Sequence, residues 1–149
     1  MAKKEVEVEV EIEIGILKIK DLGFMINDSI DPGEESQIQY NLDLNYNLDE
    51  DWIEFTIEAE FRDSLTEKSY LNGKVLTRFQ VKNLKNFINP QGINLPPEIM
   101  TTMFSMSFTH TRAILAKNTV GSKFGDAYLP IINPVEVLNH FLGKNRVSE

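Results

Sequence analysis

The chain of 149 residues contains no cysteine and only two histidines, His110 and His140. It can therefore form neither a disulfide nor a thiolate metal centre. Basic residues are also scarce, 15 against 23 acidic ones, and the formal net charge is -8. Nonspecific binding to nucleic acids or anionic membranes needs a basic surface, so neither partner is expected. With no run of 18 apolar residues and no signal-like start, the sequence predicts no membrane insertion and a cytoplasmic location.

Catalytic motifs are missing as well. The sequence has no phosphate-binding glycine loop, no His-Glu-x-x-His and no nucleophile elbow. Spacing ties neither histidine to a carboxylate or serine that would make it a general base. The acidic run at 49–51 is interpreted as a hairpin turn rather than a cation site. We therefore predict no enzyme, no cofactor and no metal site.

Alternating patterns predict four strands. Residues 5–14 read EVEVEVEIEI, which places five glutamates on one face of a strand and Val or Ile on the other. This strand is expected to continue to about residue 20 past a bulge or bend at Gly15, and 21–36 is expected to be a long connection. The same alternation predicts the other strands at 38–48, 53–61 and 70–82. Short polar turns between consecutive strands favour an antiparallel meander.

The longest helical pattern covers residues 96–120, with prolines suited to a first turn and a glycine after its end. Its apolar residues, among them Ala113 and Val120, predict a face that covers the sheet. The opposite face carries no charge between Glu98 and Arg112, which predicts burial against another subunit. The candidates for this oligomer interface are Thr101, Thr102, Ser105, Thr109 and Arg112.

A shorter helix is predicted from a cap at Asn133 to a stop at Gly143, and residues 144–149 are expected to fray. The predicted fold class is therefore α+β, a four-stranded antiparallel sheet covered by one long helix, with a short C-terminal helix. No linker or repeat divides the chain, so 1–149 is expected to be one domain. Residues 1–15 are expected to be a glutamate-rich extension of its first strand.

At residues 17–24, LKIKDLGF resembles the first-strand signature of the SecB family of export chaperones. Later features agree in order with the same family. They are the LDL strand at 42–44, the acidic strand at 52–61, a Thr-Arg-containing helix at 109–118, and LPIINPV at 129–135. The similarity covers roughly residues 16–142.

This resemblance implies an ATP-independent holdase that binds unfolded or precursor polypeptides and forms a homotetramer, a dimer of dimers. The positions that correspond to the family's client-binding surface are Phe24, Ile26, Tyr40, Leu42, Leu44, Leu138, Phe141 and Leu142. Asp21 matches an acidic residue that docks on the translocase motor. Met25, Asn72 and Lys74 depart from the other docking positions, which weakens the expectation of delivery to the translocase.

Other functions are compatible with the same residues. The protein can be a dedicated chaperone of a single client such as an antitoxin, as some SecB-like proteins are. In a different class, the interface between sheet and helix can form a pocket for a small molecule or lipid. The five aligned glutamates at 5–13 are interpreted either as a solvated face or as a docking site for a basic partner.

Overall fold

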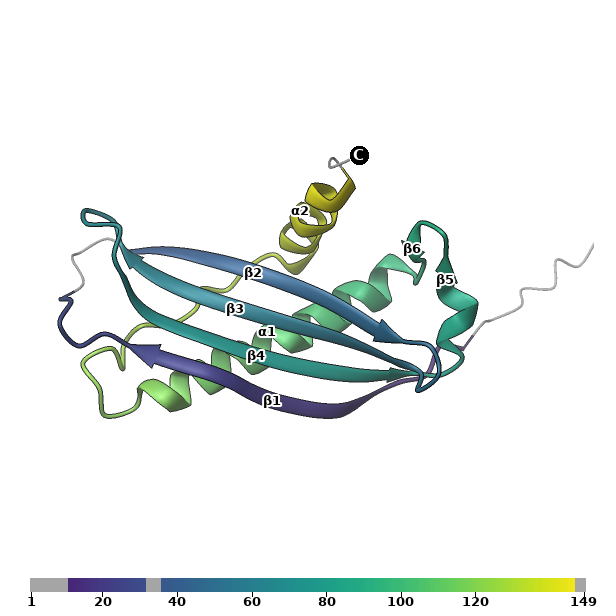
Figure 1. Ribbon diagram of the computed structural model, residues 1–149, viewed down its shortest axis with the longest axis horizontal. Helices are drawn as coiled ribbons and strands as arrows, with labels where there is room; N and C mark the ends of the chain where they lie inside the picture. The colour runs from purple at the N-terminus through teal and green to yellow at the C-terminus, as the bar shows by residue number, and fades with distance from the viewer. Residues whose placement is uncertain (1–10, 32–35, 147–149) are drawn as a thin grey trace, which may run out of the picture.

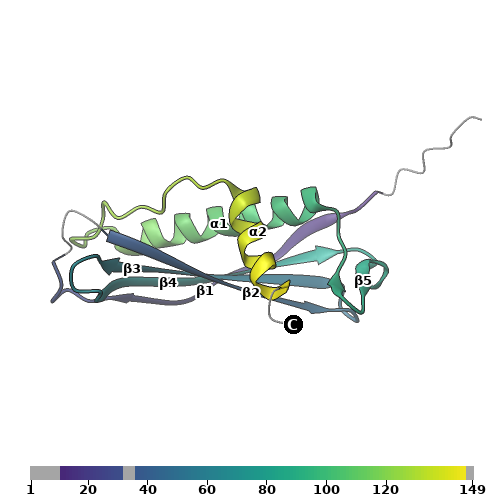
Figure 2. The ribbon, with the colours of Figure 1, turned by 90° about the horizontal axis from the view of Figure 1, so that it is seen from above.

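The computed structural model describes residues 11–31 and 36–146. A four-stranded antiparallel sheet has the spatial order β1-β4-β3-β2. The long helix α1 (Pro97–Thr119) lies across one face of this sheet, and the short helix α2 (Pro134–Arg146) lies beyond its β2 edge (Figures 1 and 2). The predicted α+β class is confirmed. The strands are β1 (Ile14–Ile26), β2 (Ser36–Asn47), β3 (Trp52–Asp63) and β4 (Ser69–Val81).

The place of β1 in the sheet differs from the prediction. β1 pairs with β4 and not with β2, and Ile16, for example, lies opposite Phe79. The predicted meander therefore holds for β2, β3 and β4 but is wrong for β1. Within the described residues, β1 and β2 are the two free edges of the sheet.

β1 also begins and ends later than its alternation predicted. It starts at Ile14, residues 11–13 precede it, and the predicted strand residues 5–10 lie outside the described part. It continues to Ile26, so the expected connection at 21–36 is wrong in its first part. The register shifts at Leu17 and again at Leu22, and the bulge expected at Gly15 is therefore displaced. Pairing with β4 keeps the strand in place through both bulges.

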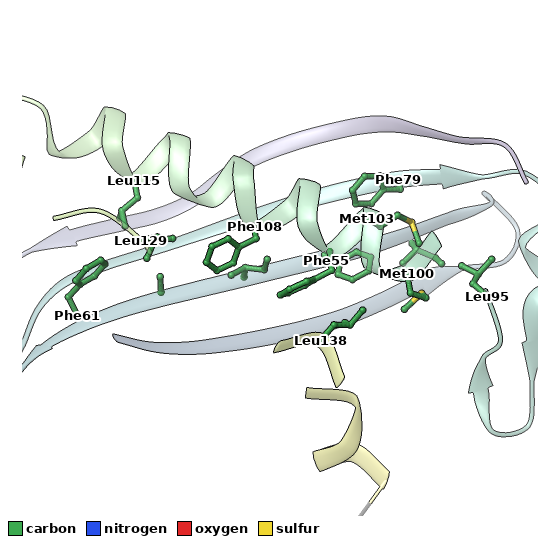
Figure 3. Packing of buried hydrophobic residues seen from close by; sticks show 14 of the residues in the cluster. Phe55, Phe61, Phe79, Leu95, Met100, Met103, Phe108, Leu115, Leu129 and Leu138 are labelled. Atoms are coloured by element: carbon green, nitrogen blue, oxygen red, sulfur yellow. The ribbon is translucent and has the colours of Figure 1, made fainter. Parts of the chain in front are cut away.

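The core lies between the sheet and α1. Alternate residues of β3 and β4 face the helix, and the rings of Phe55 and Phe79 meet edge to face at 5.8 Å. Met103 of α1 is fully buried above them (Figure 3). Leu138 of α2 closes one border of the same cluster and is only 2% exposed. Burial of these large side chains anchors both helices to the sheet.

The buried face of α1 contains more polar residues than the pattern predicted. Ser107, Thr111 and Thr119 are buried against the sheet, while Ala113 and Val120, expected on the apolar face, are exposed. The three buried hydroxyls donate to carbonyls four residues earlier, at 2.8, 2.9 and 3.0 Å. Their hydrogen bonds are thereby satisfied inside the helix, and their short side chains allow a close approach to the sheet.

Two short elements connect β4 to α1. A 3₁₀ helix, η1 (Leu84–Phe87), is followed by a hairpin of β5 (Ile88–Asn89) and β6 (Gly92–Ile93). Leu84 is fully buried, so this connection is tied to the core. No helix within the described residues is long and apolar enough to span a membrane.

α2 begins at the predicted cap. The side-chain oxygen of Asn133 accepts hydrogen bonds from the backbone N–H groups of Val135 (3.1 Å) and Glu136 (3.4 Å). The helix continues past Gly143 to Arg146, so the predicted stop at Gly143 is wrong. A glycine inside a helix costs only about 1 kcal/mol relative to alanine, which the neighbouring turns can offset. Residues 147–149 lie outside the described part.

Candidate binding groove

An open groove of about 810 Å³ follows the free edge of the sheet at β2. Six consecutive residues of β2, from Ile38 to Asp43, line it. Side chains alternate between the two faces of a strand, so six lining residues in a row place the groove around the edge and not on one face. The first turns of α2 form the opposite wall, which contributes Glu136, Val137, His140 and Phe141.

The side of the groove that faces the helix layer is apolar. Tyr40 and Leu42 of β2 and Phe141 of α2 are each half-buried here. The ring of Tyr40 meets Phe108 edge to face at 5.4 Å, and the ring of Phe141 lies 6.5 Å from Phe104. Both groove aromatics are thus held by the core, so they present a preformed apolar surface with few rotamers to lose on binding.

The phenol of Tyr40 is in an unusual setting for a groove residue. Its hydroxyl is buried and has no hydrogen-bond partner within the described part of the chain. Burial raises the pKa of Tyr40, and the positive charge of Arg112 opposes this with a smaller effect. The phenol therefore stays neutral. Its hydroxyl is removed from water without gaining a hydrogen bond in the fold, which destabilises the folded state.

The remaining lining is polar and mostly acidic. Asp43, Glu58 and Glu136 contribute carboxylates, and Lys74 is the single lysine or arginine among the lining residues. The Glu58 carboxylate accepts a hydrogen bond from the Asn41 side chain at 3.3 Å. An apolar wall beside an acidic rim can bind a segment that combines apolar with basic side chains.

The structure brings together three of the client-binding candidates at the groove, namely Tyr40, Leu42 and Phe141. Leu44 and Leu142 are half-buried against the core outside the groove lining. Two apolar lining residues, Ile38 and Val137, were not among the candidates. Ile38 shares the alternation of Tyr40 and could have been included on that signal, whereas nothing in the helical pattern distinguishes Val137.

The other client-binding candidates lie elsewhere. Leu138, at 2% exposure, belongs to the core. Phe24 and Ile26 are half-buried on β1, which is separated from β2 by two strands. These three residues share the apolar character of the groove candidates but not their position.

The interface candidates share the side of α1 away from the sheet. Thr102 and Thr109 are exposed, and Thr101 and Ser105 are half-buried. Arg112 is partly covered by its own chain: its guanidinium donates to the carbonyls of Leu129 (3.3 Å) and Pro130 (3.0 Å).

Asp21, the docking candidate on β1, is exposed and engaged within the chain. One carboxylate oxygen accepts a hydrogen bond from the backbone of Gly23 at 3.1 Å, and the other accepts one from the Asn118 side chain at 2.8 Å. The second bond places Asp21 on the side of the sheet that α1 covers. The carboxylate therefore fastens the second bulge of β1 to the end of α1.

No family model matches the chain, and no curated protein matches it. Among solved structures, it is similar to the SecB-like chaperone Rv1957 of Mycobacterium tuberculosis, solved in complex with a ChAD peptide from the HigA1 antitoxin Rv1956. The two share 12% sequence identity with a TM-score of 0.59, over 80% of this chain and 90% of that chain. This likeness shows that the chain has a SecB-like α+β fold. The solved neighbour is a chaperone.

Proposed function

We propose that this chain is a member of the SecB family and acts as an ATP-independent chaperone that holds unfolded or precursor polypeptides. The groove at the β2 edge carries the proposal. Its free strand edge offers backbone hydrogen-bonding groups to an extended segment, and its wall offers Tyr40, Leu42 and Phe141 to apolar side chains. The similar fold of a chaperone solved with a bound peptide supports this function over catalysis.

Self-association is part of the proposal, in which the chain is a single domain that forms a homotetramer in the cytoplasm. The hydroxyls of Thr102 and Thr109 donate within α1, to Glu98 (2.8 Å) and Ser105 (2.9 Å). Their outer surface is therefore mainly methyl groups, which favours contact with protein over contact with water. Thr101, Ser105 and Arg112 extend the proposed interface along the same helix.

The client can be one protein or many. The peptide in the neighbour comes from an antitoxin, which supports a dedicated client of that kind as the more specific version. Delivery to the translocase motor is the other version, for which Asp21 is the proposed contact. Its carboxylate is engaged with Gly23 and Asn118, which weakens that version. Recovery by pull-down of a single protein encoded by an adjacent gene would favour the dedicated-client version. Recovery of many precursor proteins would favour delivery to the translocase.

The holdase activity is tested by light scattering during the refolding of a chemically denatured protein, with the full chain in excess. Suppression of aggregation is expected for the wild type, and Phe141→Ser is expected to weaken it at least several-fold. Tyr46→Ser is the matched control, because Tyr46 lies on β2 and is 44% exposed but does not line the groove. Absence of suppression by the wild type would overturn the proposal.

The small-molecule or lipid alternative predicts that a defined ligand copurifies with the protein. The groove argues against it, because binding sites for small ligands usually bury most of the ligand surface and this one is open along the sheet edge. Native mass spectrometry separates the two functions. A stoichiometric bound ligand would favour the alternative over the chaperone.

A further inference from the structure

The stretch between the two α-helices, residues 120–133, contains no helix or strand. It leaves the end of α1, runs back alongside that helix and brings α2 to the β2 edge of the sheet (Figures 1 and 2). Because α2 forms one wall of the groove, the path of this stretch decides where that wall stands.

Arg112 of α1 holds this stretch by two hydrogen bonds. Its Nε donates to the carbonyl of Leu129 at 3.3 Å, and its Nη2 donates to the carbonyl of Pro130 at 3.0 Å. The guanidinium forms no ion pair among the residues that the structure describes. Hydrogen bonds from a charged donor are about twice as strong as those between neutral groups. A planar fork of fixed donors also sets the direction of both carbonyls, which a lysine ammonium cannot do.

The two carbonyls lie close in the chain to the start of α2. Only two residues separate Pro130 from the cap residue Asn133, so a span of at most about 11 Å of extended chain connects them. The first turns of α2 follow at once and carry the groove wall, including Phe141. A fixed Pro130 therefore limits where the first turn of α2 can lie.

Apolar burial alone does not set the orientation of α2. Leu129 and Leu138 are buried, at 3% and 2% exposure, and anchor the stretch and the helix to the core. Burial is non-directional, so these anchors fix the depth of α2 but not its rotation about them. A cavity of about 130 Å³, lined among others by Thr109, Arg112 and Pro134, lies between α1 and the start of α2. The first turn of α2 is thus not held by close packing, and the hydrogen bonds of Arg112 supply its direction.

Arg112 also contacts the support of the opposite wall. Its guanidinium carbon lies 5.2 Å from the centre of the Phe108 ring, a distance at which a cation is attracted to an aromatic face. Phe108 in turn meets Tyr40 of β2 edge to face at 5.4 Å. One side chain therefore joins the backbone that leads to α2 with the aromatic pair that supports β2.

We propose that Arg112 is the positioning residue of the groove and holds α2 opposite β2 at the width that an extended polypeptide segment requires. This role rests on the proposed chaperone function. Arg112 acts through the carbonyls of Leu129 and Pro130 and does not line the groove itself. The role is separate from the α1 interface, because both hydrogen bonds lie within one chain.

The absence of cysteine allows the distance between the two walls to be measured with site-specific spin labels. Asn45→Cys on β2 and Asn139→Cys on α2 provide the attachment sites, both exposed and outside the groove lining. The labelled chain is exchanged with an excess of unlabelled chain of the same variant, so that distances within one chain dominate. Pulsed electron paramagnetic resonance is expected to give a narrow distribution for the wild type and one at least about twofold broader for R112K and R112Q.

Binding is measured on the same variants with reduced and alkylated lysozyme, a permanently unfolded, basic probe. R112K and R112Q are each expected to bind it at least about fivefold more weakly, the equivalent of one lost hydrogen bond. K117Q is the matched control, because it loses the same charge as R112Q at an exposed site on α1, and it should keep the wild-type affinity and distribution. Urea unfolding identifies a variant that fails to fold, and R112K, which keeps the charge, carries the test if R112Q does.

Narrow, wild-type distributions in R112K and R112Q would overturn the proposal, and so would a broader distribution with unchanged affinity. Weaker binding with an unchanged distribution would overturn it too, because Arg112 would then act on the client or the assembly directly. Failure of the wild type to bind the unfolded probe would overturn the proposed function instead. The distance measurement would still decide whether Arg112 positions α2.

Discussion

Thr77 of β4 and His110 of α1 are joined by a hydrogen bond of 3.0 Å across the interface between sheet and helix. The Thr77 side chain is fully buried, and His110 is half-buried beside it. Burial lowers the pKa of His110 from its ordinary value of about 6.5. The imidazole is therefore held neutral in the folded protein, where it can accept the bond from the threonine hydroxyl.

This lowered pKa predicts that the free energy of unfolding falls on mild acidification. As pH drops below about 6.5, the unfolded chain binds a proton at His110 before the folded chain does. Stability is thus fully present above pH 6.5 and is lost as pH falls toward the folded-state pKa. Urea unfolding between pH 8 and 5 measures this loss, and His110→Asn should reduce the slope.

Replacement of Gly73 should destabilise the fold by overpacking. A Cβ at Gly73 of β4 would lie 2.7 Å from Cδ1 of Leu115, a buried residue of α1. We expect Gly73→Ala to lower the free energy of unfolding by about 1–3 kcal/mol. Gly23→Ala on the neighbouring strand is the control, since no atom lies within 4 Å of its Cβ position. Equal effects of the two substitutions would contradict the close approach of Leu115.

Removal of the Tyr40 hydroxyl should be tolerated. This hydroxyl is buried without a hydrogen-bond partner among the described residues, so its loss relieves a desolvation cost. Tyr40→Phe is expected to leave the unfolding free energy unchanged or to raise it by up to about 1 kcal/mol, and to retain suppression of aggregation. Tyr40→Ser removes the ring that packs on Phe108 and should weaken suppression. Destabilisation by Tyr40→Phe, measured in urea, would show that the hydroxyl has a favourable partner.

A charge on the outer face of α1 should disrupt the proposed helix interface. Thr109→Glu would bury a carboxylate between subunits, and the one basic candidate on this face, Arg112, already donates to the carbonyls of Leu129 and Pro130. The buried charge therefore costs on the order of several kcal/mol if the face is covered. The expected result is a smaller molar mass by light scattering with an unchanged circular dichroism spectrum. Gln91→Glu has the same charge change at an exposed site in the β5–β6 turn and should keep the wild-type mass. Equal masses for both variants would argue against this interface.

Local patterns were sufficient for much of the fold. The alternation in β2, β3 and β4 and the helical period of α1 reflect which side of each element meets the core. This periodicity can be read from the residues of each segment alone. The cap at Asn133 is also local, because its partners lie two and three residues ahead. Gly143, by contrast, does not end α2, which continues to Arg146, because a glycine inside a helix costs only about 1 kcal/mol relative to alanine.

The same patterns located the candidate site only in part. Leu138 and Phe141 belong to one apolar stripe of α2, yet the first is in the core and the second lines the groove. A residue that faces a groove and a residue that faces the core have the same chemistry, so periodicity cannot separate them. The difference arises from where α2 crosses the edge of β2.

The sequence by itself thus determined the class of the four long strands and the two α-helices, the acidic character of the chain and the order of segments that resembles SecB. Those properties follow from short-range spacing and composition. Only the tertiary structure decided that β1 pairs with β4, which leaves the β1 and β2 edges free. The pairing of β1 with β4 joins residues as far apart in the chain as Ile16 and Phe79, and it depends on packing that no local pattern encodes.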